Sequence, residues 1–365
     1  MTEVVFFTHN LGYGGAERCI VNITNELAER GHTVEILLVD KQGGLLQEVH
    51  DDVPVRELDG EPLIRAALDL RKFVREYSPD IIISNVNTAN LMAIAATKSI
   101  RTETSLIVGV HNTLSVKKQD YSTGVKDRII PYLMRMLYPL GDQFIAVSNG
   151  VAEDLSSTYD IPMDRMNVIY NPCVTDKILE KGTEPPDDDL FHHVGGDLIL
   201  GVGSLIEQKD FSTLIRAFSE VVKQKPDSHL VIIGDGPERT NLENLTIELG
   251  LSDKVSILGY VENVYAYMAS ADLFVLSSRW EGFGIVIVEA MAFGTPIVAT
   301  DCPHGPREIL GDGKFGRLTQ VEDSLQLADA INETLYSPPK STEIQQRAND
   351  FHVSNVADKY EKLLF

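Results

Sequence analysis

A strand–loop–helix unit is most clearly encoded in residues 273–291, LFVLSSRWEGFGIVIVEAM. The apolar run at 273–276 predicts a buried strand, and the apolar run at 285–292 predicts a buried helix. Glycines in the loop between them let the backbone approach a ligand closely. Strands that alternate with helices in this way are typical of a parallel α/β sheet.

Two glutamates, Glu281 and Glu289, interrupt this apolar unit. We expect Glu289 two turns into the helix, on the same face as Glu281 and above it. A buried carboxylate on an apolar helix costs free energy unless a partner needs it, and the first N–H groups of a helix form an anion site. The pattern predicts a polyhydroxylated ligand held between two acids and a helix start. A pair of solvated acids is the simpler alternative.

The first half of the chain repeats the alternation of short apolar runs and helical periodicity. It opens with a predicted strand at 4–8, a loop containing Gly12, Gly14 and Gly15, and a predicted helix at 16–30. Further strands are expected at 34–39, 81–84, 106–110, 143–147 and 168–170.

The acidic, proline-containing segment 183–189 reads as a linker, after which the pattern restarts. A helix is expected from residue 211, and strands at 198–203, 230–234, 255–258, 273–276 and 296–299. The fold class is therefore α/β, with two Rossmann-like doubly wound domains facing a central cleft. We expect an N-terminal domain at 1–180, a C-terminal domain at 181–345, and a C-terminal helix at 346–365 that packs back on the body.

Composition excludes several classes of protein. The chain has 365 residues and a formal net charge of −22, which argues against a nucleic-acid partner because such a protein needs a basic face. Its three cysteines are far apart in sequence, so a disulfide framework is not expected and a reducing compartment fits better. The start of the chain lacks a cationic leader, and no apolar run reaches the ~18 residues of a membrane span. We therefore expect a cytoplasmic protein.

One stretch departs from the acidic background. Basic residues border the apolar and aromatic run 129–140, which predicts an interfacial helix in peripheral contact with an anionic membrane, at the inner face of the cell membrane. A core helix with a solvated basic edge is the alternative. The basic residues are Lys117, Lys118, Lys126, Arg128 and Arg135.

The chain resembles the retaining glycosyltransferases of family 4, which have the two-domain GT-B fold. The resemblance covers nearly the whole chain and is strongest at 196–311. Several motifs in the right order carry it: Gly14-Gly15-Ala16-Glu17, the segment 203–210, Gly234-Asp235-Gly236-Pro237, and the segment from Glu281 to Glu289.

The resemblance implies a binding site for a nucleotide-sugar donor, most simply a UDP-sugar. Glu289 would accept hydrogen bonds from the ribose hydroxyls, and Glu281 would lie beside the donor sugar. The N–H groups of Phe283, Gly284 and Ile285 would bind sugar hydroxyls or phosphate. Backbone contacts on either side of the base would come from Tyr260 and Val261.

Lys209 matches the family lysine that neutralises the donor diphosphate, and an ammonium group suits a phosphate. Ser204 departs from the family pattern, which carries an arginine at this position. A charge-assisted contact contributes about 1.5–3 kcal/mol, so the missing cation must be compensated or the rate must fall. Arg279 and Arg18 are candidate substitutes.

In the first half, the Gly14-Gly15 loop opens a helix and offers backbone donors to a phosphate. His111 follows a predicted strand and, by the resemblance, contacts the sugar or supports the developing oxocarbenium charge. A histidine satisfied within the core is the alternative. The spacing of Gly12, Gly14 and Gly15 does not match a dinucleotide fingerprint, which argues against an oxidoreductase.

The implied function is retaining transfer of a sugar to a hydroxyl on a glycan or on a polyprenyl- or lipid-linked acceptor. By the resemblance, the donor would bind mainly to the C-terminal domain and the acceptor to the N-terminal domain. The attack would occur on the same face as the departing phosphate, with no cofactor and no catalytic metal; the acidic residues Asp187 to Asp189 lie in the linker. Two alternatives remain open: another enzyme class on this fold, a nucleotide-sugar epimerase or a phosphorylase, and a catalytically degenerate nucleotide-sugar-binding module.

Overall fold

The computed structural model describes residues 2–58, 63–113, 125–186 and 195–365, and their contacts form two compact units. Unit 1 comprises Met1–Pro172 and Val353–Phe365, and unit 2 comprises Cys173–His352. These boundaries differ from those expected at 180/181 and 345/346. The chain enters unit 2 earlier because the Cys173 N–H donates to the Phe351 carbonyl at 3.1 Å and helix α6 (Asp176–Lys181) packs on α10 (Val264–Ser270).

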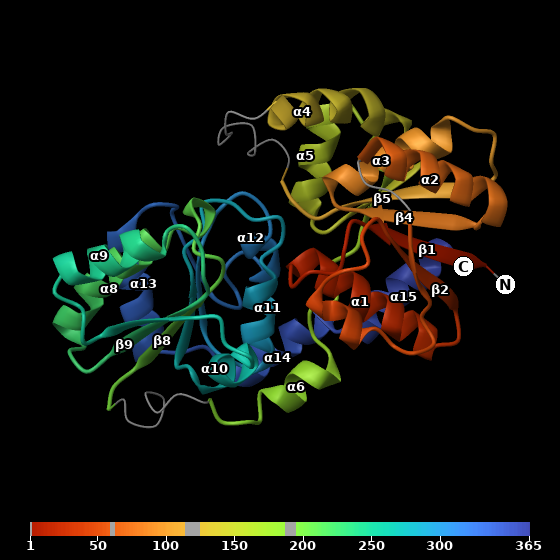
Figure 1. The fold of residues 1–365 in the computed structure, drawn as a ribbon. Helices are drawn as coiled ribbons and strands as arrows, with labels where there is room; N and C mark the ends of the chain where they lie inside the picture. The colour runs from red at the N-terminus through yellow and green to blue at the C-terminus, as the bar shows by residue number, and fades with distance from the viewer. Residues whose placement is uncertain (1, 59–62, 114–124, 187–194) are drawn as a thin grey trace. The chain divides into compact units, whose positions relative to one another are not determined.

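Unit 1 contains a seven-stranded parallel sheet with the strand order β3-β2-β1-β4-β5-β6-β7 (Figure 1). Its strands are β1 (Glu3–Thr8), β2 (Thr33–Leu38), β3 (Val55–Glu57), β4 (Ile81–Asn85), β5 (Ser105–Val110), β6 (Gln143–Ala146) and β7 (Met166–Val168). Continuous apolar runs form the central strands because both faces of a parallel sheet are covered. The expected doubly wound pattern is confirmed; β7 lies earlier than the expected 168–170, and the short edge strand β3 was not expected.

Helices cover both faces of this sheet. Figure 1 shows α1 and α15 on one side, with α2, α3 and α4 on the other. The core on the first side joins β-strand residues such as Phe6 and Ile36 to Leu27 of α1 and Val356 of α15. The helices are α1 (Gly15–Glu29), α2 (Leu63–Tyr77), α3 (Asn87–Lys98), α4 (Val125–Leu137), α5 (Asn149–Tyr159) and α15 (Val353–Leu364).

Unit 2 contains a six-stranded parallel sheet with the order β10-β9-β8-β11-β12-β13. Its strands are β8 (Leu198–Val202), β9 (His229–Ile233), β10 (Val255–Gly259), β11 (Leu273–Leu276), β12 (Ile297–Thr300) and β13 (Arg317–Thr319). The strands expected in this half are confirmed, and the three-residue strand β13 at the sheet edge was not expected. With unit 1, this establishes the predicted fold class of two Rossmann-like domains.

The helices of unit 2 bury apolar stripes against its sheet. The core cluster joins α8 (Phe211–Gln224) to α13 (Ser324–Tyr336). In it, Phe211, Leu214 and Phe218 of α8 pack with Leu327 and Ile331 of α13. The other helices are α9 (Arg239–Glu248), α11 (Ile285–Ala292), α12 (Pro306–Ile309) and α14 (Ser341–Ala348). Across the described parts of both units, no helix combines the length and apolarity that crossing a bilayer requires.

The C-terminal helix α15 is held on unit 1 by an ionic cluster as well as by its apolar face. Arg30 Nη1 lies 2.7 Å from Asp358 Oδ1 and 3.0 Å from Glu361 Oε2. His32 Nε2 lies 2.8 Å from Glu361 Oε1, and the His32 ring stacks on Phe365 with 4.0 Å between centroids. Helix α15 therefore packs on α1 within unit 1.

The Glu361 contacts predict a pH-dependent stability of unit 1. The hydrogen bond with His32, followed by the charge of Arg30, lowers the pKa of the Glu361 carboxyl below its ordinary value of 4.5. Because the folded-state pKa is lowered, this stabilisation is complete above the unfolded-state value and is lost as pH falls through the folded-state value. Glu361→Gln should lower the free energy of unfolding at neutral pH by about 1 kcal/mol or less, since the pair is partly exposed.

Urea unfolding followed by circular dichroism, from about pH 7 down to about pH 4, measures this effect. The variant should lose less stability than the wild type as the pH falls. Glu153→Gln, an exposed glutamate on α5, is the matched control and should behave as the wild type. Identical pH profiles for Glu361→Gln and the wild type would contradict the assignment.

Candidate functional site

The candidate donor site lies where the strand order of the unit 2 sheet reverses. Strands β8, β9 and β10 extend to one side of the sheet and β11, β12 and β13 to the other, so the reversal falls between β8 and β11. In open parallel sheets, ligands bind beyond the carboxyl ends of the strands at this point. The loop after β8 carries Ser204 and Lys209, and the loop after β11 carries Glu281.

Lys209 and Glu281 meet across this point. Lys209 Nζ lies 2.5 Å from Glu281 Oε1, and Ser278 Oγ donates to the same oxygen at 2.7 Å. Both side chains of the ion pair are largely buried, with exposed fractions of 17% for Lys209 and 8% for Glu281. The ammonium and the carboxylate therefore compensate each other in a partly desolvated site. The nearby Cys302 thiol has the same surroundings: burial and the Glu281 charge raise its pKa.

Backbone and side-chain hydrogen bonds join the two loops that carry this pair. Ser277 Oγ donates to the Lys209 carbonyl at 2.8 Å. Gln208 Nε2 donates to the Trp280 carbonyl at 2.8 Å, and the Arg279 N–H donates to the Gln208 carbonyl at 2.8 Å. Three cross-loop bonds limit the freedom of the loops, which favours a preorganised site.

Glycine is required behind the second loop. Gly305 has φ of +94°, and a Cβ there would lie 1.8 Å from the Phe283 carbonyl oxygen. The Phe283 side chain is buried against Phe351 with the rings edge to face at 5.5 Å. Phe283 therefore has a packing role, and the predicted ligand contact concerns its backbone N–H.

Helix α11 positions the second glutamate. Gly284, with φ of +98°, is the N-cap, and Ile285 is the first helical residue, as predicted. Glu289 is 7% exposed, and Tyr265 Oη donates to its Oε1 at 3.3 Å. Glu281 lies in the loop before α11 rather than on the helix. The expectation that the two glutamates share one helical face is wrong. The helix begins only at Ile285, after the glycine-containing loop that carries Glu281.

Ser204 carries no charge, so Lys209 is the one basic residue in the segment 203–210 that follows β8. Ser204 is exposed. Arg279, one candidate substitute for the absent arginine, is held by Glu207 at 2.6 Å, Asp210 at 3.4 Å and Glu322 at 2.9 Å. The other candidate, Arg18, belongs to unit 1, where its Nη1 lies 3.7 Å from Glu48 Oε1.

The remaining predicted residues of unit 2 follow strand β10. Tyr260 is 73% exposed, and Val261 is partly buried. Their predicted role beside a base stays a prediction.

In unit 1, the predicted residues lie at the carboxyl ends of the strands around its own order reversal, between β1 and β4. Gly14 is the N-cap of α1 and Gly15 its first residue. His111 follows β5, and its Nε2 lies 2.9 Å from Asn85 Oδ1 at the end of β4. Burial lowers the pKa of His111 to about 4, opposed by a hydrogen bond with Asn171. The ring is therefore neutral at pH 7.

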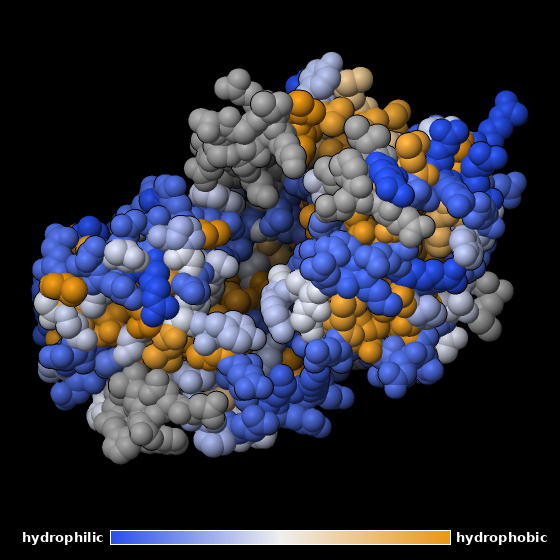
Figure 2. All heavy atoms as spheres, in the orientation of Figure 1, coloured by the Kyte–Doolittle hydropathy of each residue, from blue (hydrophilic) through white to orange (hydrophobic). Residues whose placement is uncertain are grey.

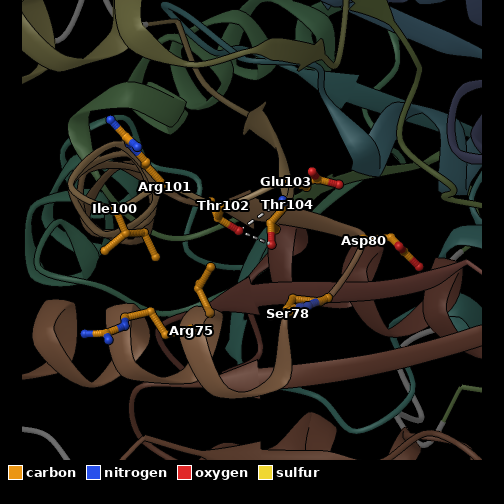
Figure 3. Close-up of a pocket in the computed structure, with 10 residues that line it drawn as sticks. Arg75, Ser78, Asp80, Ile100, Arg101, Thr102, Glu103 and Thr104 are labelled. Carbon is orange, nitrogen blue, oxygen red and sulfur yellow. Dashed lines mark hydrogen bonds between the residues drawn. The ribbon is translucent and has the colours of Figure 1, made fainter.

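Two buried hydroxyl groups accompany this edge. Thr8 Oγ1 at the end of β1 and Ser84 Oγ near the end of β4 have no hydrogen-bond partner among the described residues. Buried polar atoms are usually satisfied, so these two hydroxyl groups are candidate contacts for a ligand at this edge. A pocket of about 850 Å³ lies at the opposite, amino edge of the sheet, lined in part by Arg75, Asp80 and Arg101 (Figure 3). It contains none of the predicted site residues.

Several residues that shape the two edges were not identified from sequence. Ser278 and Tyr265 contact the two glutamates, and Asn85 contacts His111. Ser278 and Asn85 each lie two residues after a short apolar run, so the carboxyl-end rule applied to every strand would have found them. Outside the gaps at 59–62, 114–124 and 187–194, no cluster of three or more His, Cys, Asp or Glu side chains suits a metal ion; Asp187 to Asp189 fall in such a gap.

Comparisons with known proteins agree along the whole chain. Residues 13–177 match the model "Glycosyltransferase Family 4", and residues 187–351 match "Glycosyl transferases group 1". A Campylobacter jejuni protein, N-acetylgalactosamine-N,N'-diacetylbacillosaminyl-diphospho-undecaprenol 4-alpha-N-acetylgalactosaminyltransferase, is 30% identical over 92% of this chain and 90% of its own. The lipopolysaccharide core biosynthesis glycosyltransferase LpsE of Rhizobium meliloti is 28% identical over 96% of each chain.

Solved structures share the fold. Anabaena HepE in complex with UDP and glucose superposes with a TM-score of 0.79 at 22% identity, covering 100% of this chain and 99% of the other. Sucrose-phosphate synthase from Thermosynechococcus elongatus gives a TM-score of 0.82 at 19% identity, covering 100% and 98%. These are GT-B glycosyltransferase structures. The solved structures confirm the fold, and the relative that is 30% identical over 92% of this chain shows the family: the chain belongs to glycosyltransferase family 4 and is a glycosyltransferase.

Proposed function

We propose that this glycosyltransferase transfers a sugar from a UDP-sugar, with retention of anomeric configuration, to a hydroxyl of a lipid-linked glycan at a membrane surface. The observation that carries the proposal is the buried Lys209–Glu281 pair at the order reversal of the unit 2 sheet. It offers a cation for phosphate and a carboxylate for sugar hydroxyls in one place. The Anabaena HepE structures hold UDP, which supports the choice of nucleotide.

In this proposal each unit 2 residue contacts a different part of the donor. Glu289 accepts hydrogen bonds from the ribose hydroxyls, and Glu281 binds the sugar. Lys209 and the first N–H groups of α11, from Gly284 and Ile285, bind the diphosphate. Ser204 lies beside the phosphates, while Tyr260 and Val261 border the base. The buried position of Glu289 on an apolar helix supports its assignment, because such a carboxylate is costly without a hydroxyl-rich partner.

The proposed reaction breaks the bond between the sugar C1 and the leaving phosphate oxygen, and forms a bond between C1 and the acceptor oxygen on the same face. The acceptor proton passes to the departing phosphate oxygen. Lys209 and the α11 N-terminus stabilise the negative charge that develops on the diphosphate. Unit 1 supplies the Gly14-Gly15 backbone and His111 as substrate contacts.

The acceptor class rests on relatives and on one surface of unit 1. The C. jejuni relative is named for transfer to an undecaprenol-diphosphate-linked sugar, and LpsE for lipopolysaccharide core biosynthesis. Helix α4 exposes apolar side chains at helical spacing, from 37% of Leu133 to 66% of Tyr132. With Leu140 just beyond the helix, the apolar face of α4 consists of Ile129, Tyr132, Leu133, Met136 and Leu140.

Charge favours an anionic membrane as the occupant of this face. The segment 129–140 contains no acidic residue and includes the exposed Arg135, although the protein carries a net charge of −22. Figure 2 shows hydrophobic side chains at the upper edge of unit 1, where Figure 1 places α4. Lys117 and Lys118 lie outside the described residues, as do the side chains of Lys126 and Arg128. An exposed apolar stripe beside basic residues is typical of a helix that lies in a membrane interface.

The direct test is a screen of nucleotide-sugars that measures released nucleotide, followed by mass spectrometry of products formed on lipid and glycan fractions. The proposal predicts release of UDP and a product heavier by one sugar, and the anomeric proton signal of the product in NMR should show that the configuration of the donor is preserved. Conversion of the sugar without any acceptor would instead identify an epimerase. Donor binding with no transfer across a broad acceptor panel would identify a degenerate binding module.

Removing the ribose contact should weaken donor binding. Glu289→Ala deletes a charge-assisted acceptor, and the loss of about 1.5–3 kcal/mol corresponds to roughly a 10- to 150-fold rise in the donor Kd. Isothermal titration calorimetry with the UDP-sugar measures this rise. Glu333→Ala, on the exposed side of α13, is the matched control and should bind as the wild type. Unchanged donor affinity in a folded Glu289→Ala protein would remove the ribose assignment.

The diphosphate assignment predicts opposite effects for two substitutions on one loop. Lys209→Ala should lower kcat by about a hundredfold or more, because a preorganised charge at the leaving group is lost. Ser204→Arg should preserve or raise kcat, since it adds a second cation at an exposed position. Steady-state kinetics of UDP release compares them with Lys223→Ala, an exposed lysine on α8. A Lys209→Ala enzyme with wild-type kcat, or a collapse of kcat in Ser204→Arg, would contradict the assignment.

The α4 face should bind anionic vesicles. The protein should sediment with phosphatidylglycerol vesicles, bind phosphatidylcholine vesicles less, and be released by salt. Replacing Ile129, Tyr132 and Met136 by serine should abolish sedimentation, and neutralising the four nearby basic residues Lys117, Lys118, Lys126 and Arg128 should weaken it. Leu325→Ser, which removes an apolar side chain that is 64% exposed in unit 2, is the control. Equal partitioning of wild type and the α4 variant would exclude this face as the membrane contact.

A further inference from the structure

The environment of His111 in unit 1 contains a feature that the family motifs do not include. Asn85, the last residue of β4, is opposite Gly109 in the register of the parallel pair β4–β5, and His111 follows β5. Asn85 is 4% exposed, and its Oδ1 lies 2.9 Å from His111 Nε2. The amide and the imidazole therefore form a hydrogen bond at the carboxyl edge of the sheet.

The orientation of the Asn85 amide is fixed by its second hydrogen bond. Asn85 Nδ2 donates to the Ile83 carbonyl at 3.2 Å. A carbonyl accepts and cannot donate, so the Asn85 nitrogen must be on that side and Oδ1 must face the histidine. An amide oxygen only accepts. The hydrogen of the Asn85–His111 bond therefore belongs to His111 Nε2.

The backbone around Asn85 is adapted to hold this side chain. A Cβ at Gly109 would lie 2.5 Å from Asn85 Oδ1, so the absence of a side chain at 109 makes the space that the amide occupies. Val86, directly after Asn85, has φ of +73°. This value is unusual for a β-branched residue and strains the backbone. Such strain persists where surrounding contacts determine the local geometry, and it is concentrated at functional sites.

We propose that Asn85 is a positioning residue, which holds the His111 ring in the tautomer protonated at Nε2 and so makes Nδ1 a hydrogen-bond acceptor for the substrates. This inference rests on the proposed function, because it assumes that His111 contacts the reacting groups. His111 then acts as a neutral acceptor for a hydroxyl group. It does not supply a positive or donating edge to the developing oxocarbenium charge.

The electrostatic setting agrees with a neutral ring. Burial lowers the pKa of His111 to about 4, and a hydrogen bond with Asn171 opposes this shift. Among the described residues, no charged side chain contributes to the pKa of His111. The neutral form therefore dominates at pH 7, and a neutral imidazole has one donor and one acceptor nitrogen. With Nε2 as the donor to Asn85, Nδ1 is the acceptor, and this buried nitrogen has no hydrogen-bond partner among the described residues.

The tautomer can be measured without any substrate. Protein labelled with ¹⁵N-histidine gives ring-nitrogen signals that distinguish the two neutral tautomers, and His111→Gln identifies the signals of His111 by their loss. The wild type should show His111 protonated at Nε2 near pH 7. A ring protonated at Nδ1, or a charged ring at that pH, would overturn the proposal. This result is independent of whether the donor screen detects transfer.

Two variants at Asn85 test the positioning role. Asn85→Asp keeps the acceptor and the shape but adds a negative charge, and it should raise the pKa of His111 by about one unit or more. Asn85→Leu removes the acceptor, and the Nδ1-protonated tautomer should appear in the ¹⁵N spectrum. Both should lower kcat for UDP release about tenfold or more while the donor KM changes little. Asn85→Asp should also shift the pH–rate profile.

Asn87→Asp is the matched control. It places the same new carboxylate at the first position of α3, close in sequence to Asn85 but without the His111 contact. It should leave the tautomer, the pKa of His111 and kcat as in the wild type. If the Asn85 variants change the tautomer but preserve kcat, Asn85 has no positioning role in the reaction. If they preserve the tautomer, the amide does not determine it.

Discussion

The Lys209–Glu281 ion pair is the interaction on which the candidate donor site depends. It joins loops that leave the unit 2 sheet at adjacent strands, β8 and β11, which come from separate parts of the sequence. Removing one partner of a buried pair leaves an uncompensated charge, which is strongly destabilising. The pair therefore keeps the carboxyl edge of the sheet formed and charged, and a diphosphate offers Lys209 a second anionic partner without requiring a new fold of the loop.

The two units differ in how they present polar groups. Unit 2 concentrates formal charge at its edge, in Lys209, Glu281 and the buried Glu289. The corresponding edge of unit 1 has neutral groups: the hydroxyls of Thr8 and Ser84 and the uncharged ring of His111. Charged groups suit a nucleotide-sugar with its diphosphate, whereas neutral hydrogen-bonding groups suit a sugar hydroxyl. This division is consistent with donor binding in unit 2 and acceptor binding in unit 1, as proposed.

Sequence predicted most of the fold because the central strands are buried on both faces and therefore apolar throughout, as in β1 and β11. The short edge strands β3 and β13 were not predicted, because each contains an arginine (Arg56 and Arg317) and neither has a continuous apolar run. The site was predictable where a motif carries it, as for Lys209 and Glu281. The Asn85–His111 bond was not, because it depends on strand register and on the space left by Gly109. The boundary between the two units after Pro172 was also not predicted, because it depends on long-range contacts such as that of Cys173 with Phe351.

The return of the chain to unit 1 at Val353 makes unit 2 an insertion within unit 1 in terms of connectivity. Val356, Tyr360 and Leu364 of α15 belong to the hydrophobic core of unit 1. Shortening the chain from its C-terminus therefore damages the unit that begins the sequence and leaves the intervening one complete. During synthesis, unit 1 cannot complete its core until the ribosome has finished unit 2. The order in which the two units mature is thus opposite to the order in which they begin.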